Sequence, residues 1–249
     1  MNIDRGLLKR NAQVVVRTAR PSLFVAAVIF LAVSIVLGYI SIRVMGMNIS
    51  PDDAANYMRY YLDGNYDALA ALLDRIQPPP SAYLINIAVS LLMTIVSAGF
   101  IIFIFNTLRG AGAVYGNLLD GFGIAGKLIG LYFLEALLIF LWSLLLIVPG
   151  LIAAYRYRMA KYIIIDDPSK GVVQSLRESK ALMHGHKWEC FVLDLSFIGW
   201  RLLELLPYLG YAVQVWTTPY IETSYALYYM ALSGKPINYT PPQSADGNI

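Results

Sequence analysis

The sequence predicts an all-α protein: a polytopic bundle of about six transmembrane helices with amphipathic helices at its surfaces. Of its 249 residues, 58% are hydrophobic and only 14% are charged, whereas soluble domains carry about 25% charged residues. The mean hydropathy is +0.58. Six long apolar stretches alternate with short charged segments. Because the chain is too short for two large membrane domains, a single membrane domain is expected.

The apolar stretches have the lengths that a bilayer requires. Residues 22–42 would extend about 31 Å as a helix, which matches a hydrocarbon core of about 30 Å. This run is longer than the apolar core of a signal peptide, so it is expected to remain as an anchor. The fourth stretch is the least clean, because three cations interrupt it. The predicted spans are residues 22–42, 83–105, 124–148, 149–165, 188–206 and 212–232.

Lysine and arginine gather on one side of the predicted bundle. The first 20 residues hold five of them, and the segment between the fourth and fifth spans holds four. The opposite side is richer in aspartate. Cytoplasmic loops of membrane proteins carry an excess of Lys and Arg. The expected location is therefore the cell membrane, multi-pass, with both termini in the cytoplasm. The net charge of +3 follows this bias and is not the footprint of nucleic-acid binding.

Three regions are expected: a basic N-terminal segment over residues 1–21, a membrane domain over 22–232, and a tail over 233–249. The tail is rich in Pro, Gly, Ser and Asn, a composition that predicts cytoplasmic disorder.

An outer amphipathic cap is expected over residues 45–82. Asp52 or Asp53 is suited to cap a first helix, Gly64-Asn65 to break it, and three prolines from Pro78 to end a second helix. Two interpretations stay open for this cap: helices lying on the outer membrane surface, or a lid or subunit contact.

An inner surface helix is expected over residues 166–187. Asp167-Pro168 has the pattern of an N-cap followed by proline in the first turn. The helix either docks on the inner surface or binds a partner.

Ionisable residues inside the predicted spans are Glu135, Arg156, Asp194 and Glu222. Such residues are costly in a membrane and need partners or water. We expect them to form a buried carboxylate–arginine network, with Asp194 nearer to Arg158 or Lys161. Arg156 and Arg158 point about 200° apart on a regular helix, and Arg156 is the one expected to face inward. The network either fixes helix packing or lines a pathway.

Glycines crowd the start of the third span. Gly126 and Gly130 have the small-xxx-small spacing that allows helices to approach closely, so they predict a packing seam. Pro149-Gly150 predicts a tight turn between the third and fourth spans.

Catalytic, cofactor and metal-binding motifs are absent from the sequence. Cys190 is the only cysteine, and His184 and His186 are isolated from other ligand types. No catalytic residue, cofactor or metal is therefore expected, and the protein is not expected to be an enzyme. A membrane enzyme that acts on lipid would have only these two histidines as candidates.

The C-terminal half carries the most specific pattern. Ser179 to Lys187 leads into Phe191 to Trp200, and Thr218-Pro-Tyr220 precedes an aromatic run ending at Tyr229. With Pro149-Gly150, Arg156-Tyr157 and Asp167-Pro168, this stretch resembles a bacterial membrane-protein family, domain of unknown function 975, over about residues 108–235. The cap over residues 45–82 lies outside the resemblance. The resemblance implies a multi-span helical protein of the bacterial plasma membrane and no established chemistry.

The functional prediction is a transporter or channel-like protein for a small solute, ion or amphiphile, which uses the buried network. The alternative is a homo-oligomeric structural or interaction protein in which the network only fixes packing. The expected partners are membrane lipids, further copies of the chain or a small solute, and no nucleic acid.

Overall fold

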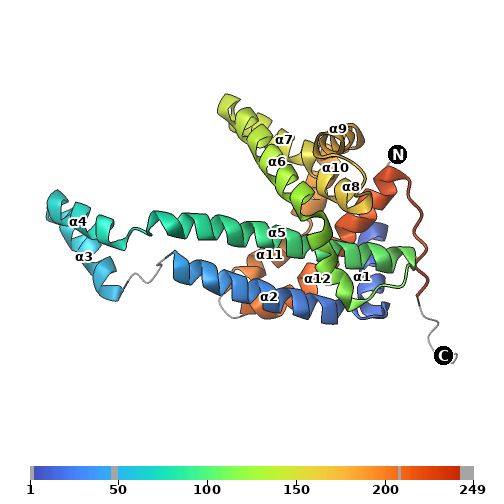
Figure 1. Ribbon diagram of the computed structural model, residues 1–249, viewed down its shortest axis with the longest axis horizontal. Helices are drawn as coiled ribbons and strands as arrows, with labels where there is room; N and C mark the ends of the chain where they lie inside the picture. Colours follow the sequence, from blue (N-terminus) through green and yellow to red (C-terminus); the bar gives the residue numbers. More distant parts are fainter. Residues whose placement is uncertain (1–2, 46–49, 207–208, 242–249) are drawn as a thin grey trace. The chain divides into compact units, whose positions relative to one another are not determined.

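The computed structural model describes residues 3–45, 50–206 and 209–241, and every regular element in these ranges is a helix. This confirms the all-α prediction. The chain divides into two compact units, one formed by residues 1–31 and 94–249 and the other by residues 32–93. Two helices, α2 (Leu23–Val44) and α5 (Pro80–Arg109), continue from one unit into the other (Figure 1).

Three helical segments in the described part of the chain are long and apolar enough to cross a membrane: Leu23–Val44, Pro80–Arg109 and Tyr115–Leu145. The third joins a 3₁₀ helix, η1 (Tyr115–Ile124), to α6 (Ala125–Leu145). These segments correspond to the first three predicted spans, and they suggest a membrane location. The count of six spans is not confirmed.

The last three predicted spans differ from simple apolar rods. The fourth is broken into α7 (Ile147–Tyr157) and α8 (Ala160–Asp166), and the fifth into α10 (Lys187–Leu195) and α11 (Ile198–Glu204). The sixth is one helix of 25 residues, α12 (Leu209–Ser233). Its length suffices, but its composition is more polar because it carries Glu222 and many tyrosines and threonines.

α12 forms the centre of the larger unit. From Tyr220 to Met230 every residue except Glu222 is buried. A helix that is buried on all sides belongs to a core rather than to a surface. α1 (Arg5–Thr18) and α11 pack against it (Figure 1). α1 starts at Asp4, whose carboxylate accepts hydrogen bonds from two backbone N–H groups in the first turn.

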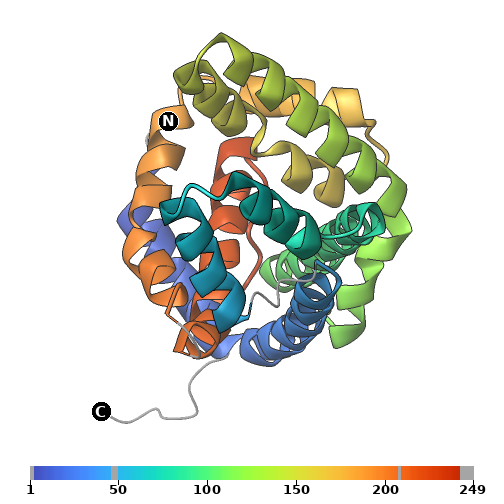
Figure 2. The ribbon, with the colours of Figure 1, turned by 90° about the vertical axis from the view of Figure 1, so that its left-hand side faces the viewer.

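α6 and α7 lie side by side as a tight hairpin (Figures 1 and 2). The chain reverses at Leu146, which has an extended backbone between the two helices. The predicted turn at Pro149-Gly150 is therefore displaced, because both residues lie inside the first turn of α7, where proline costs no hydrogen bond. Gly150 is needed there, since a Cβ would lie 2.1 Å from the Ser143 hydroxyl oxygen.

The closest glycine contacts between chain segments involve other residues than the predicted seam. Nothing lies within 4 Å of a Cβ built on Gly126, and one built on Gly130 meets only Val172 at an ordinary 3.4 Å. Instead, a Cβ on Gly99 of α5 would lie 1.9 Å from the Leu118 carbonyl oxygen, and one on Gly121 of η1 would lie 2.2 Å from the Ile95 carbonyl oxygen. The seam therefore joins α5 to η1.

Residues 50–77 form two short helices, α3 (Pro51–Leu62) and α4 (Tyr66–Ile76), as predicted for the cap. Ser50, rather than Asp52 or Asp53, caps α3. The two residues form a capping box, in which the Ser50 hydroxyl accepts from the Asp53 N–H and the Asp53 carboxylate accepts from the Ser50 N–H. These bonds to Ser50, with the positive charge of Arg75, lower the pKa of Asp53. Gly64, at φ +65°, allows the turn before α4. Residues 46–49 of the predicted cap lie outside the described residues.

The inner segment and the tail also differ from expectation. The inner surface helix is shorter than predicted: α9 spans Val172–Leu182 with Gly171 at its N-cap position. Asp167 instead ends α8. The tail from residue 234 to 241 has no regular structure but is held against the larger unit, because the Asn238 N–H donates to the Leu108 carbonyl at 3.0 Å. The rest of the tail lies outside the described residues.

Replacement of Gly121 by alanine is expected to destabilise the protein by about 1–3 kcal/mol, because its Cβ would overlap a backbone carbonyl that cannot move freely. Gly126→Ala is the matched control, since its site is open and helical, and it is expected to be neutral or stabilising by up to about 1 kcal/mol. Thermal unfolding in one detergent measures both. An equal loss of stability in the two variants would contradict the close contact of Gly121 with α5.

Candidate functional site

The most buried carboxylate among the ion pairs of the described residues is Asp166, at the C-terminal end of α8. Its side chain is only 2% exposed. It forms ion pairs with Arg109, at the end of α5, and with Lys235, just after α12. The Tyr229 hydroxyl of α12 donates to it at 2.6 Å. A buried charge is tolerated when it is paired and hydrogen-bonded, and here three chain segments supply the partners.

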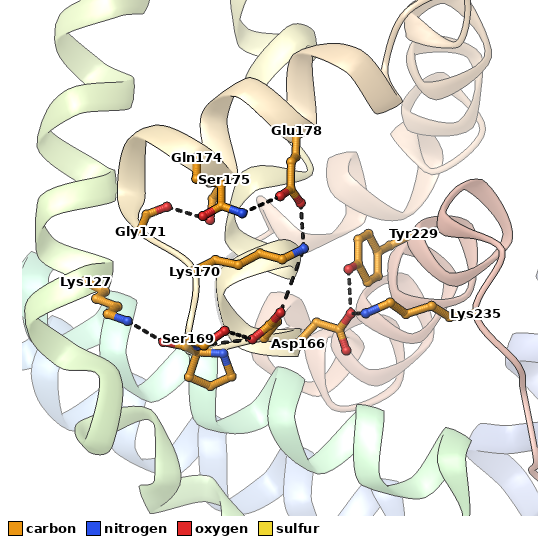
Figure 3. A network of polar contacts seen from close by, with 12 residues as sticks. Lys127, Asp166, Ser169, Lys170, Gly171, Gln174, Ser175, Glu178, Tyr229 and Lys235 are labelled. Carbon is orange, nitrogen blue, oxygen red and sulfur yellow. Dashed lines mark hydrogen bonds and ion pairs between the residues drawn. The ribbon is translucent and has the colours of Figure 1, made fainter.

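A second layer of polar contacts surrounds the loop that follows Asp166 (Figure 3). Asp167 accepts two bonds from Ser169, from the backbone N–H and from the hydroxyl, and these bonds lower the pKa of its carboxyl. Lys170 donates to Glu178 of α9 at 2.6 Å and so lowers the pKa of that carboxyl. Lys127 of α6 donates to the Pro168 carbonyl oxygen. The loop is thus tied to α6 and α9.

Asp194 of α10 bridges two broken helices. It accepts a bond from the Arg158 guanidinium at 2.9 Å and one from the Tyr155 hydroxyl at 2.8 Å. Arg158 lies where α7 gives way to α8, and Asp194 lies two residues before the break between α10 and α11. The ion pair therefore connects one break to the other.

Ser179 of α9 satisfies the backbone at the first of these breaks. Its hydroxyl donates to the Arg156 carbonyl oxygen at 3.0 Å and accepts from the Met159 N–H at 3.1 Å. Ser179 is fully buried. Unpaired backbone groups are costly away from water, so this one side chain compensates for the interruption of the helix.

Glu222 of α12 has a similar environment. The Tyr162 hydroxyl donates to it at 3.2 Å, and the Lys161 amine lies 3.8 Å away. Tyr162 also stacks on Tyr229, with ring centroids 5.9 Å apart. The aromatic stack therefore joins the surroundings of Glu222 to those of Asp166.

The four predicted residues do not form one network. Arg156 contacts no carboxylate in the part of the chain that is described; its guanidinium lies over the Trp142 ring, 5.2 Å from the centroid. The two arginines point apart as helix geometry requires, but Arg158, and not Arg156, is the one that contacts a carboxylate. Asp194 pairs with Arg158, as expected.

Glu135 of α6 is half-buried and stands apart from these pairs. Among the described residues it forms no ion pair within 4.0 Å and no hydrogen bond. The positive charges of Lys161 and Arg158 act on it from a longer range. Of the four predicted residues, it is the carboxylate that is left without a direct partner.

The remaining candidates show no sign of a metal site. In the described ranges no group of three His, Cys, Asp or Glu side chains could hold a metal ion. His186 bonds to Glu189 at 2.9 Å at the start of α10, and Gly185 beside it has φ +83°. The two histidines thus lie in the turn between α9 and α10.

Sequence reasoning did not single out Asp166. The sequence gives a partial indication of its ion pairs, because the predicted topology places Arg109 and Lys235 on the same side of the membrane as Asp166, at the end of the fourth span. What the pattern lacks is the information that α5, α8 and the tail converge on one point.

The bundle and its apolar segments define a class of helical protein with three candidate membrane spans. The chain belongs to the family described as protein of unknown function (DUF975), whose model matches residues 84–235. The match begins within α5, earlier than the expected residue 108, and leaves out the cap over residues 45–82, as expected. No curated protein and no solved structure matches the chain.

Asp166→Asn is expected to lower the free energy of unfolding by about 3–5 kcal/mol, because it leaves two cations without their shared buried partner. Asp167→Asn is the matched control at the next position. Its carboxylate is 40% exposed, so a much smaller loss is expected. Thermal unfolding monitored by circular dichroism compares them. Similar losses would show that Asp166 has no special role.

Ser179→Ala is expected to cost about 1–3 kcal/mol, since it leaves a carbonyl and an N–H unpaired at the α7–α8 break. Ser175→Ala, also buried in α9, removes only a bond to the Gly171 carbonyl in its own helix, so a smaller loss is expected. Hydrogen exchange of the Met159 amide, which donates to the Ser179 hydroxyl, measures the loss of this bond and is expected to become faster. Unchanged exchange in Ser179→Ala would contradict the assignment.

Proposed function

We propose that the protein is a multi-pass protein of the plasma membrane, with six spans and both termini in the cytoplasm, that moves or gates a small solute, ion or amphiphile without catalysing a reaction. In this topology the fourth and fifth spans are the broken pairs α7–α8 and α10–α11. Non-helical backbone at membrane depth is tolerated only where it is buried in protein or lines a water-filled cavity.

The observation that carries this proposal is the ion pair between the two breaks. Transporters bind substrates and ions near helix interruptions that lie at membrane depth. Here Arg158 and Asp194 lie at such interruptions and contact each other at 2.9 Å. The pair is accessible in part, with side chains 31% and 25% exposed, so it is able to exchange partners.

Glu135 supplies the second element of the proposed pathway. An ionisable residue inside a membrane segment is by default a functional candidate, and this one lies within electrostatic range of Arg158 and Lys161. A cation or proton that neutralised Glu135 would change the balance at the Arg158–Asp194 pair.

The topology is supported by the placement of the cations. Arg109, Lys127, Lys170 and Lys235 all gather around the loop after Asp166. The positive-inside rule assigns such a cluster to the cytoplasmic side.

Hydration at Glu135 tests the proposal. In a Cys190→Ala background, Glu135→Cys is expected to react with a membrane-impermeant, charged thiosulfonate reagent in proteoliposomes, because a pathway must be wet. Phe133→Cys, two residues away and 55% exposed on the surface of α6, is the control; in the proposed topology it faces lipid and is expected to stay unmodified. An unreactive Glu135→Cys in a folded protein would overturn the transport proposal.

Assembly with further copies of the chain is the second candidate, and the α6–α7 hairpin favours it. Its apolar side chains are widely exposed, with Ile147 at 86%, and lipid or a neighbouring copy would cover them. Native mass spectrometry from lipid nanodiscs separates the two candidates, since a discrete oligomer with an unreactive Glu135→Cys supports assembly alone.

A further inference from the structure

An apolar pocket lies between α1, α12 and the tail, away from Glu135 and the broken helices. Its volume is about 230 Å³. Its walls are formed by Asn11, Val14 and Val15 of α1, Leu227 of α12, and Ile237 and Tyr239 of the tail. Most of these side chains are apolar, which suits a hydrocarbon ligand rather than a polar solute.

The wall contributed by the tail is held in place by polar bonds. The Tyr239 hydroxyl bonds to the Thr18 hydroxyl at 2.8 Å. The Asn238 N–H donates to the Leu108 carbonyl oxygen, and Lys235 pairs with Asp166. The pocket is therefore a built feature, because three separate contacts position the segment that closes it.

The outer face of α1 beside the pocket is both apolar and basic. Leu7 and Val14 are 54% and 43% exposed. Arg10 and Arg17 are exposed one turn on either side of Val14. Neither arginine pairs with a carboxylate among the described residues, and Arg17 lies over the Trp216 ring.

This combination has a specific physical meaning. Apolar residues beside arginines on an exposed helix face suit the boundary between lipid headgroups and acyl chains, because the long arginine side chains can reach the headgroups from an apolar surface. There, arginine binds phosphate through paired N–H donors. Two unpaired cations at the rim of an apolar pocket complement a molecule with a negative head and a hydrocarbon chain.

We propose that this pocket is a binding site for an anionic phospholipid of the adjacent leaflet, with an acyl chain in the pocket and the phosphate between Arg10 and Arg17. The site is separate from the proposed pathway and does not depend on transport. It gives the N-terminal helix a partner of defined chemistry.

Native mass spectrometry of the full-length protein, equilibrated with mixed phosphatidylcholine and phosphatidylglycerol, tests the site. The expected result is one retained phosphatidylglycerol per chain. Arg10→Gln with Arg17→Gln is expected to weaken its retention about thirtyfold, the effect of two charges near an anionic surface. The control is Arg177→Gln with Lys180→Gln, which removes the same charge from the exposed face of α9 and is expected to leave retention unchanged.

A second pair of variants separates the pocket from simple charge attraction. Val14→Trp fills the pocket from its rim and is expected to abolish retention while the protein stays folded. Val173→Trp, at a position 60% exposed on α9, is its control. Retention that survives Val14→Trp, or that falls equally in both charge-removal pairs, would overturn the proposal.

Discussion

The larger unit depends on one buried carboxylate. Asp166 holds the end of α5, the end of α8 and the chain after α12 through Arg109, Lys235 and Tyr229. Removing one partner of a buried ion pair leaves an uncompensated charge, which costs far more than the intact pair contributes to stability. These three segments are therefore expected to stay together in the folded protein. The matched family region ends at Lys235, the residue that closes this contact. Arg109, Asp166, Tyr229 and Lys235 therefore all lie within the matched region.

Side-chain hydrogen bonds likewise compensate for the backbone hydrogen bonds that are lost where helices are interrupted. At the α7–α8 break the freed carbonyl and N–H both bond to Ser179. At the α10–α11 break the Ser196 hydroxyl donates a hydrogen bond to the Leu193 carbonyl oxygen at 2.6 Å, and the Lys9 amine of α1 donates one to the Ser196 hydroxyl. Each interruption is thus covered by a side chain from a neighbouring helix or from the break itself. A break that is compensated in this way is a stable feature, and it can hold a charged pair at a fixed place.

The sequence predicts the helices well and their partners less well, for a physical reason. Uniform apolarity over 20 residues is a local signal, so the first three spans follow from it directly. The two breaks occur at Arg158-Met159 and Ser196-Phe197, where no proline or glycine interrupts the helical pattern. The first is compensated by Ser179, a side chain distant in the sequence. Helix geometry likewise shows that Arg156 and Arg158 diverge, but only the positions of Trp142 and Asp194 decide which one faces a carboxylate. The close approach at Gly99 and Gly121 depends in the same way on the path of η1.

Three carboxylates of the bundle share one arrangement: each accepts from a tyrosine hydroxyl and lies beside a cation. Asp194 contacts Tyr155 and Arg158, and Glu222 contacts Tyr162 and Lys161. Asp166 contacts Tyr229 and two cations, Arg109 and Lys235. In a medium of low dielectric constant, a carboxylate that is paired and hydrogen-bonded in this way is costly to separate from its partners. Glu135 lies outside the pattern, because it is a half-buried carboxyl group with neither a hydroxyl nor a cation in contact. In the proposed transport function, a ligand or proton would therefore act at Glu135 first, and through the field of Arg158 it would reach the pair that joins the two broken helices.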